Sequence, residues 1–141
     1  MNLNQLLLVL HFLGLGMGLA ASVVGLVLRG LLAGADPAEA RGLVRIGPVM
    51  AQVGGSGLLL LWATGFMLTF TKWGGFGALP WQFHAKLGFV VLLTLAVGAS
   101  HAFQAKARRG DAAAAAMLPR IGLVSLVSSI LVVVFAVLTF D

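Results

Sequence analysis

Four long apolar runs constrain this chain more than any other feature of its sequence. Each has the roughly 20 apolar residues that a helix needs to cross a bilayer. Only 9% of the residues are Asp, Glu, Lys or Arg, whereas a water-facing surface needs roughly 25%. We therefore predict an all-α integral membrane protein, a single four-span domain folded as a four-helix bundle of antiparallel up-down topology. The predicted spans are about residues 3–28, 43–70, 81–105 and 120–140.

The basic residues are distributed unevenly between the two ends of such a bundle. Seven follow the first and third runs, whereas only Lys72 and Lys86 belong to the other end. The positive-inside rule then predicts a multi-pass protein of the inner (plasma) membrane, with both termini outside and both basic loops in the cytoplasm. We expect the positive charge to contact the lipid bilayer, because no basic–aromatic pattern for nucleic acid is present. The seven are Arg29, Arg41, Arg45, Lys106, Arg108, Arg109 and Arg120.

Small residues form a stripe in the first run, and a histidine lies in the same stripe. The stripe continues from His11 at helical spacing through Gly14, Gly18, Ala21 or Ser22, and Gly25. Steps of three and four residues lie on one helix face, and small residues let helices approach closely in lipid. We expect this face, including the imidazole, to point into the bundle. Two further packing stripes are predicted, one of Gln52, Gly55 and Ser56 and one of Gly122, Ser125, Ser129, Val132 and Ala136.

The third run carries two stripes that face different ways. His84 begins one stripe, and Lys86 begins the other, which ends at His101. Helical spacing separates the first two side chains by roughly 200° around the helix. One of them is therefore expected to serve a site, while the other reaches the membrane interface.

Depth along the spans limits which of these side chains can meet. At 1.5 Å per residue, His11 lies roughly 12 Å into the first span and Lys86 roughly 7 Å into the third. A site that pairs His11 with Lys86 or with His84 is therefore geometrically reasonable. His101 differs from His11 in depth by about 10 Å or more, so these two are not expected to pair.

Several chemistries lack their residues in this chain. No Asp or Glu lies inside a run and there is no cysteine, which excludes carboxylate relays and thiolate metal sites. Three histidines at different depths match zinc poorly. A buried imidazole in an apolar bundle suits b-type haem, with His11 as the candidate ligand of the haem iron and His84 and Lys86 as further candidates for binding the cofactor. The alternative is that His11 only hydrogen-bonds a neighbouring helix, at Gln52 or a serine.

Three short motifs resemble those of a known family. The LHF sequence at 10–12, Gly65 and the WQFHAKL segment at 81–87 are similar to HemJ-type protoporphyrinogen oxidases and to related CopD-like small four-helix membrane proteins. The resemblance implies an oxidoreductase that converts protoporphyrinogen to protoporphyrin, with associated haem b. It also implies catalytic roles for His11 and Lys86. The chain lacks the arginine of the family's first span and the Asn and Glu that open its fourth, which is typical of a divergent relative.

Two other functions remain open from the sequence. Small-residue faces on several spans favour an accessory or structural subunit, packed in a homo-oligomer or in a larger membrane complex. Such a subunit would have no enzymatic activity. A permease for copper or a small solute is the third reading, because methionine sulfur is a soft ligand. The methionines concerned are Met17, Met50, Met67 and Met117.

Overall fold

The computed structural model describes residues 2–140 and, with the exception of Phe140, their side chains. The described residues form an all-α bundle in which four helices are long and apolar enough to cross a membrane. This confirms the predicted four-helix membrane protein. The elements are α1 (Leu3–Gly34), α2 (Pro37–Leu43), α3 (Ile46–Thr71), the short 3-10 helix η1 (Phe76–Ala78), α4 (Trp81–Arg108) and α5 (Ala112–Phe140).

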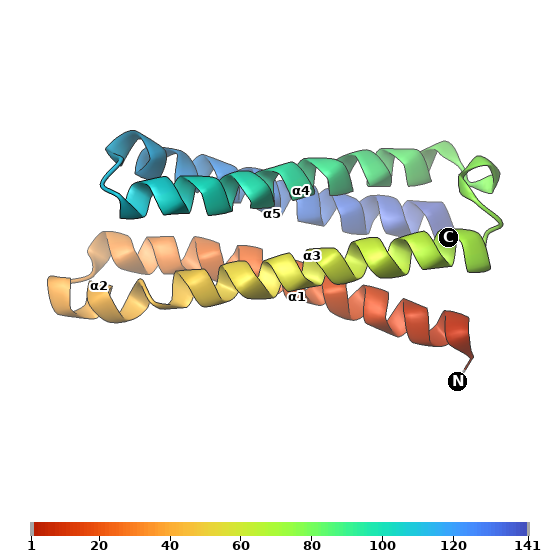
Figure 1. Cartoon of the computed structure of the whole chain (residues 1–141), viewed down its shortest axis with the longest axis horizontal. Coiled ribbons are helices and arrows are strands. Elements are labelled where there is room, and N and C mark those ends of the chain that lie inside the picture. The colour runs from red at the N-terminus through yellow and green to blue at the C-terminus, as the bar shows by residue number, and fades with distance from the viewer. Residues whose placement is uncertain (1, 141) are drawn as a thin grey trace.

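The long helices form two antiparallel pairs (Figure 1). α1 packs mainly on α3 and α4 mainly on α5, while α1 also contacts α5 and α3 meets α4 over only a few residues. The two chain ends and η1 lie at one end of the bundle, which we call the termini end. α2 and the turn between α4 and α5 lie at the opposite end, which we call the basic end.

Local signals explain where the helices begin. The Asp36 carboxylate accepts hydrogen bonds from the backbone N–H groups of Ala38 and Glu39, at 2.8 and 2.9 Å, and so caps α2. Asp111 accepts from Ala114 N at 2.9 Å and caps α5 in the same way. Just before it, Gly110 has a φ of 91°, a conformation that glycine adopts without steric cost.

The last helix begins earlier than the hydropathy of the sequence indicates. α5 starts at Ala112 rather than near residue 120, and Pro119 lies inside it. The Asp111 cap and the alanine run after it stabilise the helix enough for it to continue through the proline. In a membrane bundle, neighbouring side chains can satisfy the backbone around such a proline. Separately, Arg29 Nη1 donates to the carbonyl oxygen of Pro119 itself at 3.3 Å.

α1 and α3 cross at two glycines. A Cβ atom built on Gly14 would lie 2.8 Å from the Gly57 carbonyl oxygen, and one built on Gly57 would lie 2.7 Å from the Gly14 carbonyl oxygen. Only glycine at both positions permits this approach. Further along, a Cβ on Gly54 would lie 3.1 Å from Ala21 Cβ. Gly14 and Ala21 of the predicted small-residue face therefore pack on α3, whereas a Cβ at Gly18 or Gly25 would meet nothing within 4 Å.

The predicted packing stripe of the second span is wrong. Gln52 and Ser56 are exposed, and α3 turns Gly54 and Gly57 toward α1 instead. Several glycines close together in this segment offered more than one small face, so spacing alone could not select the packed one. The stripe in α5 is confirmed by its burial, with Ser125, Ser129 and Val132 all inaccessible at the centre of the bundle.

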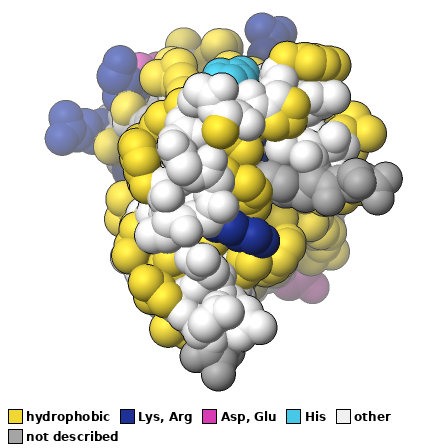
Figure 2. Space-filling view, turned by 90° about the vertical axis from the view of Figure 1, so that its right-hand side faces the viewer, with side chains coloured by type: hydrophobic (Ala, Val, Ile, Leu, Met, Phe, Trp, Pro, Cys, Tyr) yellow, Lys and Arg dark blue, Asp and Glu magenta, His cyan; other side chains and the backbone are white. Residues whose placement is uncertain are grey.

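The outer surface of the bundle is apolar, as a lipid-facing surface must be. Leu59 is 72% exposed and Leu95 is 64% exposed, although both lie in the middle of long helices. Figure 2, which looks onto the termini end, shows hydrophobic side chains around the rim of the bundle. The protein is therefore a multi-pass membrane protein whose natural solvent is the lipid bilayer.

Candidate functional site

An apolar cavity of about 320 Å³ opens between the helices toward the termini end. All four long helices and η1 contribute to its walls, and we call it the His11 cavity. Most of the lining is aliphatic or aromatic, and a few polar side chains enter it. Among its lining residues are His11, Trp62, Gly65, Phe66, Thr69, Phe76, Phe83, Lys86, Leu87 and Val90.

His11 is held against α3 by one polar contact and one glycine. Its Nδ1 atom lies 2.8 Å from Thr64 Oγ1, and the threonine is buried. A Cβ atom at Gly65 would lie 3.3 Å from His11 Cε1, so the absence of a side chain there lets the imidazole rest on the α3 backbone. The structural partner of His11 is therefore a threonine, and neither Gln52 nor a serine.

The hydrogen bonds of Thr64 determine which imidazole nitrogen carries the proton. The threonine hydroxyl donates to the Leu60 carbonyl oxygen at 2.6 Å. A hydroxyl has a single hydrogen, so its oxygen can only accept from His11. When the threonine donates to Leu60, His11 Nδ1 carries the proton of the neutral ring and Nε2 keeps its lone pair. This is the arrangement in which a histidine ligates a metal through one nitrogen while the other nitrogen donates to the protein.

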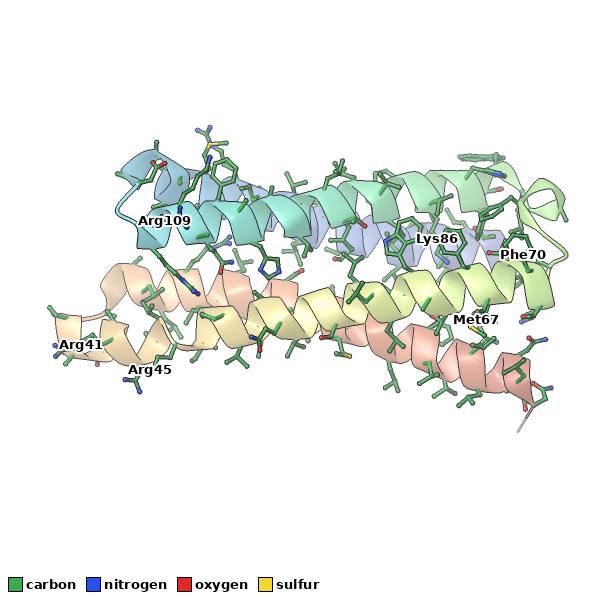
Figure 3. The ribbon with its side chains drawn as sticks, viewed as in Figure 1. Arg41, Arg45, Met67, Phe70, Lys86 and Arg109 are labelled. Carbon is green, nitrogen blue, oxygen red and sulfur yellow. The ribbon has the colours of Figure 1, made fainter. Side chains whose placement is uncertain are left out.

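Lys86 enters the same cavity from α4. It lies in the termini half of the bundle (Figure 3), and its Nζ is 5.8 Å from the centre of the Phe83 ring. Lys86 and His11 both line this cavity. The cavity thus combines an imidazole from α1 with a positive charge from α4, two helices that are far apart in the sequence.

Aromatic rings form one wall of the cavity. Trp62 and Phe66 are stacked, with ring centres 5.4 Å apart and planes inclined by 24°. Phe76 of η1 then contacts Phe66 at 6.0 Å and Phe83 at 6.2 Å. Trp62 Nε1 donates to Thr94 Oγ1 at 3.0 Å, which fixes the indole. These flat faces suit a flat, largely apolar ligand.

The structure separates the other histidines from this cavity. His84 is exposed on the opposite side of α4, where its Nδ1 lies 3.2 Å from the Pro80 carbonyl oxygen. His101 lines a second cavity near the basic end. The stripe that begins at Lys86 faces inward through the buried Val90 and Leu93. Of the sequence candidates, only His11 and Lys86 are brought together.

Sequence reasoning missed Thr64 and the aromatic wall. Thr64 lies three residues after Leu61 and four before Leu68, both buried, so the helical period of α3 could have placed it on the inner face. No such signal existed for Phe76, because its place depends on how the 72–80 connection folds back over the bundle.

Comparisons with known proteins provide no relative for this chain. No model of a known protein family matches it, no curated protein is significantly similar, and no solved structure matches. The chemistry of the His11 cavity is therefore inferred from its own residues.

Proposed function

We propose that this protein binds a b-type haem or a related porphyrin in the His11 cavity and has a redox or haem-pathway role resembling that of HemJ-type protoporphyrinogen oxidases. One observation carries the proposal. His11 and Lys86, from different helices, converge in one apolar cavity with an aromatic wall. These are also the two residues to which the family resemblance assigns function.

The donor set suits haem better than a bare metal ion. Among the described residues, no group of three or more His, Cys, Asp or Glu side chains could hold a metal ion. A haem iron needs only one or two protein ligands, because the macrocycle supplies the others. His11 Nε2 has the lone pair for that bond, and Thr64 orients the ring. Bound haem would supply one-electron redox chemistry at its iron.

Lys86 would serve the acidic groups of such a ligand. Porphyrins of this class carry carboxylate side chains, which an ammonium group attracts most strongly where water is scarce. The cavity volume of about 320 Å³ lies near the lower end of the range for small-molecule sites. A tetrapyrrole would therefore fill it and extend from its mouth, with its carboxylates near Lys86.

Visible spectra of the detergent-purified protein, oxidised and then dithionite-reduced, test the proposal. We expect a Soret band and a sharp reduced α band, or porphyrin bands without iron if the ligand is the metal-free ring. His11→Ala should remove most of the bound haem, whereas His84→Ala, on the other face of α4, should retain it. A colourless protein from haem-replete cells, or full haem content in His11→Ala, would refute the assignment.

A second pair of variants tests the role of the lysine. Lys86→Gln should weaken the binding of a porphyrin dicarboxylate but not that of its dimethyl ester. Lys72→Gln removes an exposed charge at the same end of the bundle and should change neither affinity. Equal loss of affinity for acid and ester in Lys86→Gln would show that the lysine only supports packing.

The orientation in the inner membrane is part of the same proposal. Arg41 and Arg45 lie at the basic end, with Arg109 in the turn across from them (Figure 3). By the positive-inside rule, this distribution supports a cytoplasmic location of the basic end. Because the chain has no cysteine, single cysteines can report on topology. In intact cells, an impermeant maleimide should label Ala78→Cys at the termini end and spare Ala38→Cys in α2. The reverse labelling pattern would show that the topology is inverted.

One observation favours the alternative of an accessory subunit. The outward face of α4 carries Gly88 and Gly98, and a Cβ on either glycine would meet nothing within 4 Å. Glycines on a lipid-facing surface allow another helix to approach closely. In this alternative, a partner should co-purify in gentle detergent and be lost in Gly88→Leu. A lone monomer without haem would argue against both functions.

A further inference from the structure

A second cavity, of about 530 Å³, lies between the helices toward the basic end. We call it the Arg29 cavity. Its polar lining is cationic and amide- or hydroxyl-bearing, and none of the described residues that line it is acidic. The remaining walls are apolar and are contributed by residues such as Leu28, Leu58 and Val97. The polar lining residues are Ser22, Arg29, Ser100, His101, Gln104, Arg108 and Ser125.

Arg29 is positioned by two contacts on α5. It belongs to α1, but its Nη1 donates to the Pro119 carbonyl oxygen of α5 at 3.3 Å. The guanidinium group rests on Gly122, where any Cβ atom would collide with it. This bond uses one of the five N–H donors of an arginine. The guanidinium is thus half-buried and held in place, with donors left for a ligand in the cavity.

Further donors come from the opposite side, on α4. Arg108 lines the cavity at the end of this helix. Gln104 Nε2 donates to Ser100 Oγ at 3.1 Å, which orders that part of the wall. His101 Nε2 points toward α3 and lies 3.8 Å from where a Cβ of Gly55 would be. Positive charge therefore faces the cavity from α1 and from α4.

The lengths of α1 and α4 are consistent with a position of the two arginines near the lipid phosphates. Arg29 is 26 residues beyond Leu3 in α1, roughly 39 Å along a helix at 1.5 Å per residue. Arg108 is 27 residues beyond Trp81 in α4, roughly 40 Å by the same rise. The hydrocarbon core is about 30 Å thick, and the bilayer with its headgroups about 40–45 Å. If Leu3 and Trp81 lie at the outer surface of the bilayer, both guanidinium groups fall within the opposite headgroup layer.

We propose that the Arg29 cavity binds a phosphate-bearing anion, and that this anion is the headgroup of an anionic phospholipid. Guanidinium groups pair with phosphate oxygens through parallel hydrogen bonds. The apolar wall below them accommodates the first part of an acyl chain. Basic pockets between membrane helices on the cytoplasmic side bind headgroups in this way. The site lies at the other end of the bundle from the His11 cavity and does not depend on what that cavity binds.

The test is a titration of the full chain in a mild non-ionic detergent, followed by native mass spectrometry and by thermal unfolding. The added probes are phosphatidylglycerol, phosphatidylcholine and inorganic phosphate. The variants are Arg29→Gln and Arg108→Gln. Arg41→Gln and Arg45→Gln are the matched controls, because both are exposed arginines at the same end that do not line the cavity.

We expect one retained phosphatidylglycerol per chain and a raised unfolding temperature, with no such effect of phosphatidylcholine. Loss of one charged contact should weaken the binding by about tenfold in Arg29→Gln and in Arg108→Gln, and leave the controls unchanged. If Arg29→Gln does not fold, the result for Arg108→Gln still decides the outcome, because Arg108 is exposed. Equal weakening in all four variants, or equal retention of both lipids, would overturn the proposal. Protection by inorganic phosphate without lipid retention would overturn the lipid assignment and leave a soluble phosphate as the ligand.

Discussion

Replacing Gly14 by alanine would test the close crossing of α1 and α3 that holds His11 in place. The added Cβ would lie 2.8 Å from the Gly57 carbonyl oxygen, 3.2 Å from Leu61 N and 3.3 Å from Leu60 Cβ. All three are backbone or Cβ atoms, so no change of rotamer relieves the contact. Ordinary van der Waals contact begins at 3.4 Å, so the helices must separate locally by 3.4 − 2.8 Å, or about 0.6 Å.

The free-energy cost of this overpacking can be isolated by comparison with a second alanine substitution, two residues away. Gly16 lies in the same helix, and a Cβ there would meet nothing within 4 Å. Both substitutions gain the same helix propensity, roughly 0.5–1 kcal/mol. Only Gly14→Ala overpacks the interface, which typically costs about 1–3 kcal/mol. We therefore expect Gly14→Ala to be less stable than Gly16→Ala by about 1–3 kcal/mol. The gain in helix propensity is common to both variants and cancels in this difference.

The local separation of α1 from α3 in Gly14→Ala would also disturb the His11 cavity. His11 lies one turn before Gly14, and its Nδ1 is 2.8 Å from Thr64 Oγ1. Moving α1 away by about 0.6 Å would stretch this bond to about 3.4 Å, near the limit of a hydrogen bond. Gly14→Ala should therefore lower the affinity for the ligand of the His11 cavity, while Gly16→Ala should not.

Reversible unfolding in mixed micelles of mild detergent and sodium dodecyl sulfate, followed by far-ultraviolet circular dichroism, measures the difference in stability. Spectral titration with haemin measures the difference in affinity. Equal stability of the two alanine variants would refute the close helix crossing. A stability difference without an affinity difference would show that α1 relaxes without disturbing His11.

Three further substitutions follow from single contacts. Thr64→Val should weaken haemin binding by about 10–100-fold in a spectral titration, and Thr139→Val, whose hydroxyl donates within α5 to the Phe135 carbonyl oxygen and does not line the cavity, is the control; equal effects would refute the role of Thr64 in orienting His11. Asp111→Ala removes the cap of α5 and should lower the free energy of unfolding by about 1 kcal/mol in the same micelle assay; an unchanged value would show that the alanine run suffices. Pro119→Ala should raise the unfolding temperature, because it restores a helix N–H while the carbonyl that accepts from Arg29 remains; a lower temperature would show that the proline sets a bend that the bundle needs.

Periodicity predicted much of the candidate site because helical geometry is local. The small-residue stripe correctly placed His11 on the inner face of α1, and the spacing within the third span separated Lys86 from His84 around the helix. The same reasoning failed in α3, where adjacent glycines offered several small faces. It also placed the start of the last span near residue 120, because the sequence pattern does not show that the helix capped by Asp111 continues through Pro119.

By itself, the sequence determined the class of protein and the spans, since the bilayer requires long apolar helices and those are visible residue by residue. It also determined that Lys86 and His84 cannot serve one site. Only the tertiary structure decided that Lys86 faces inward, that Thr64 orients His11 and that Arg29 and Arg108 share a cavity. These juxtapositions join residues on different helices. They depend on the rotation and crossing of packed helices, which close glycine contacts set and which no pattern within one span encodes.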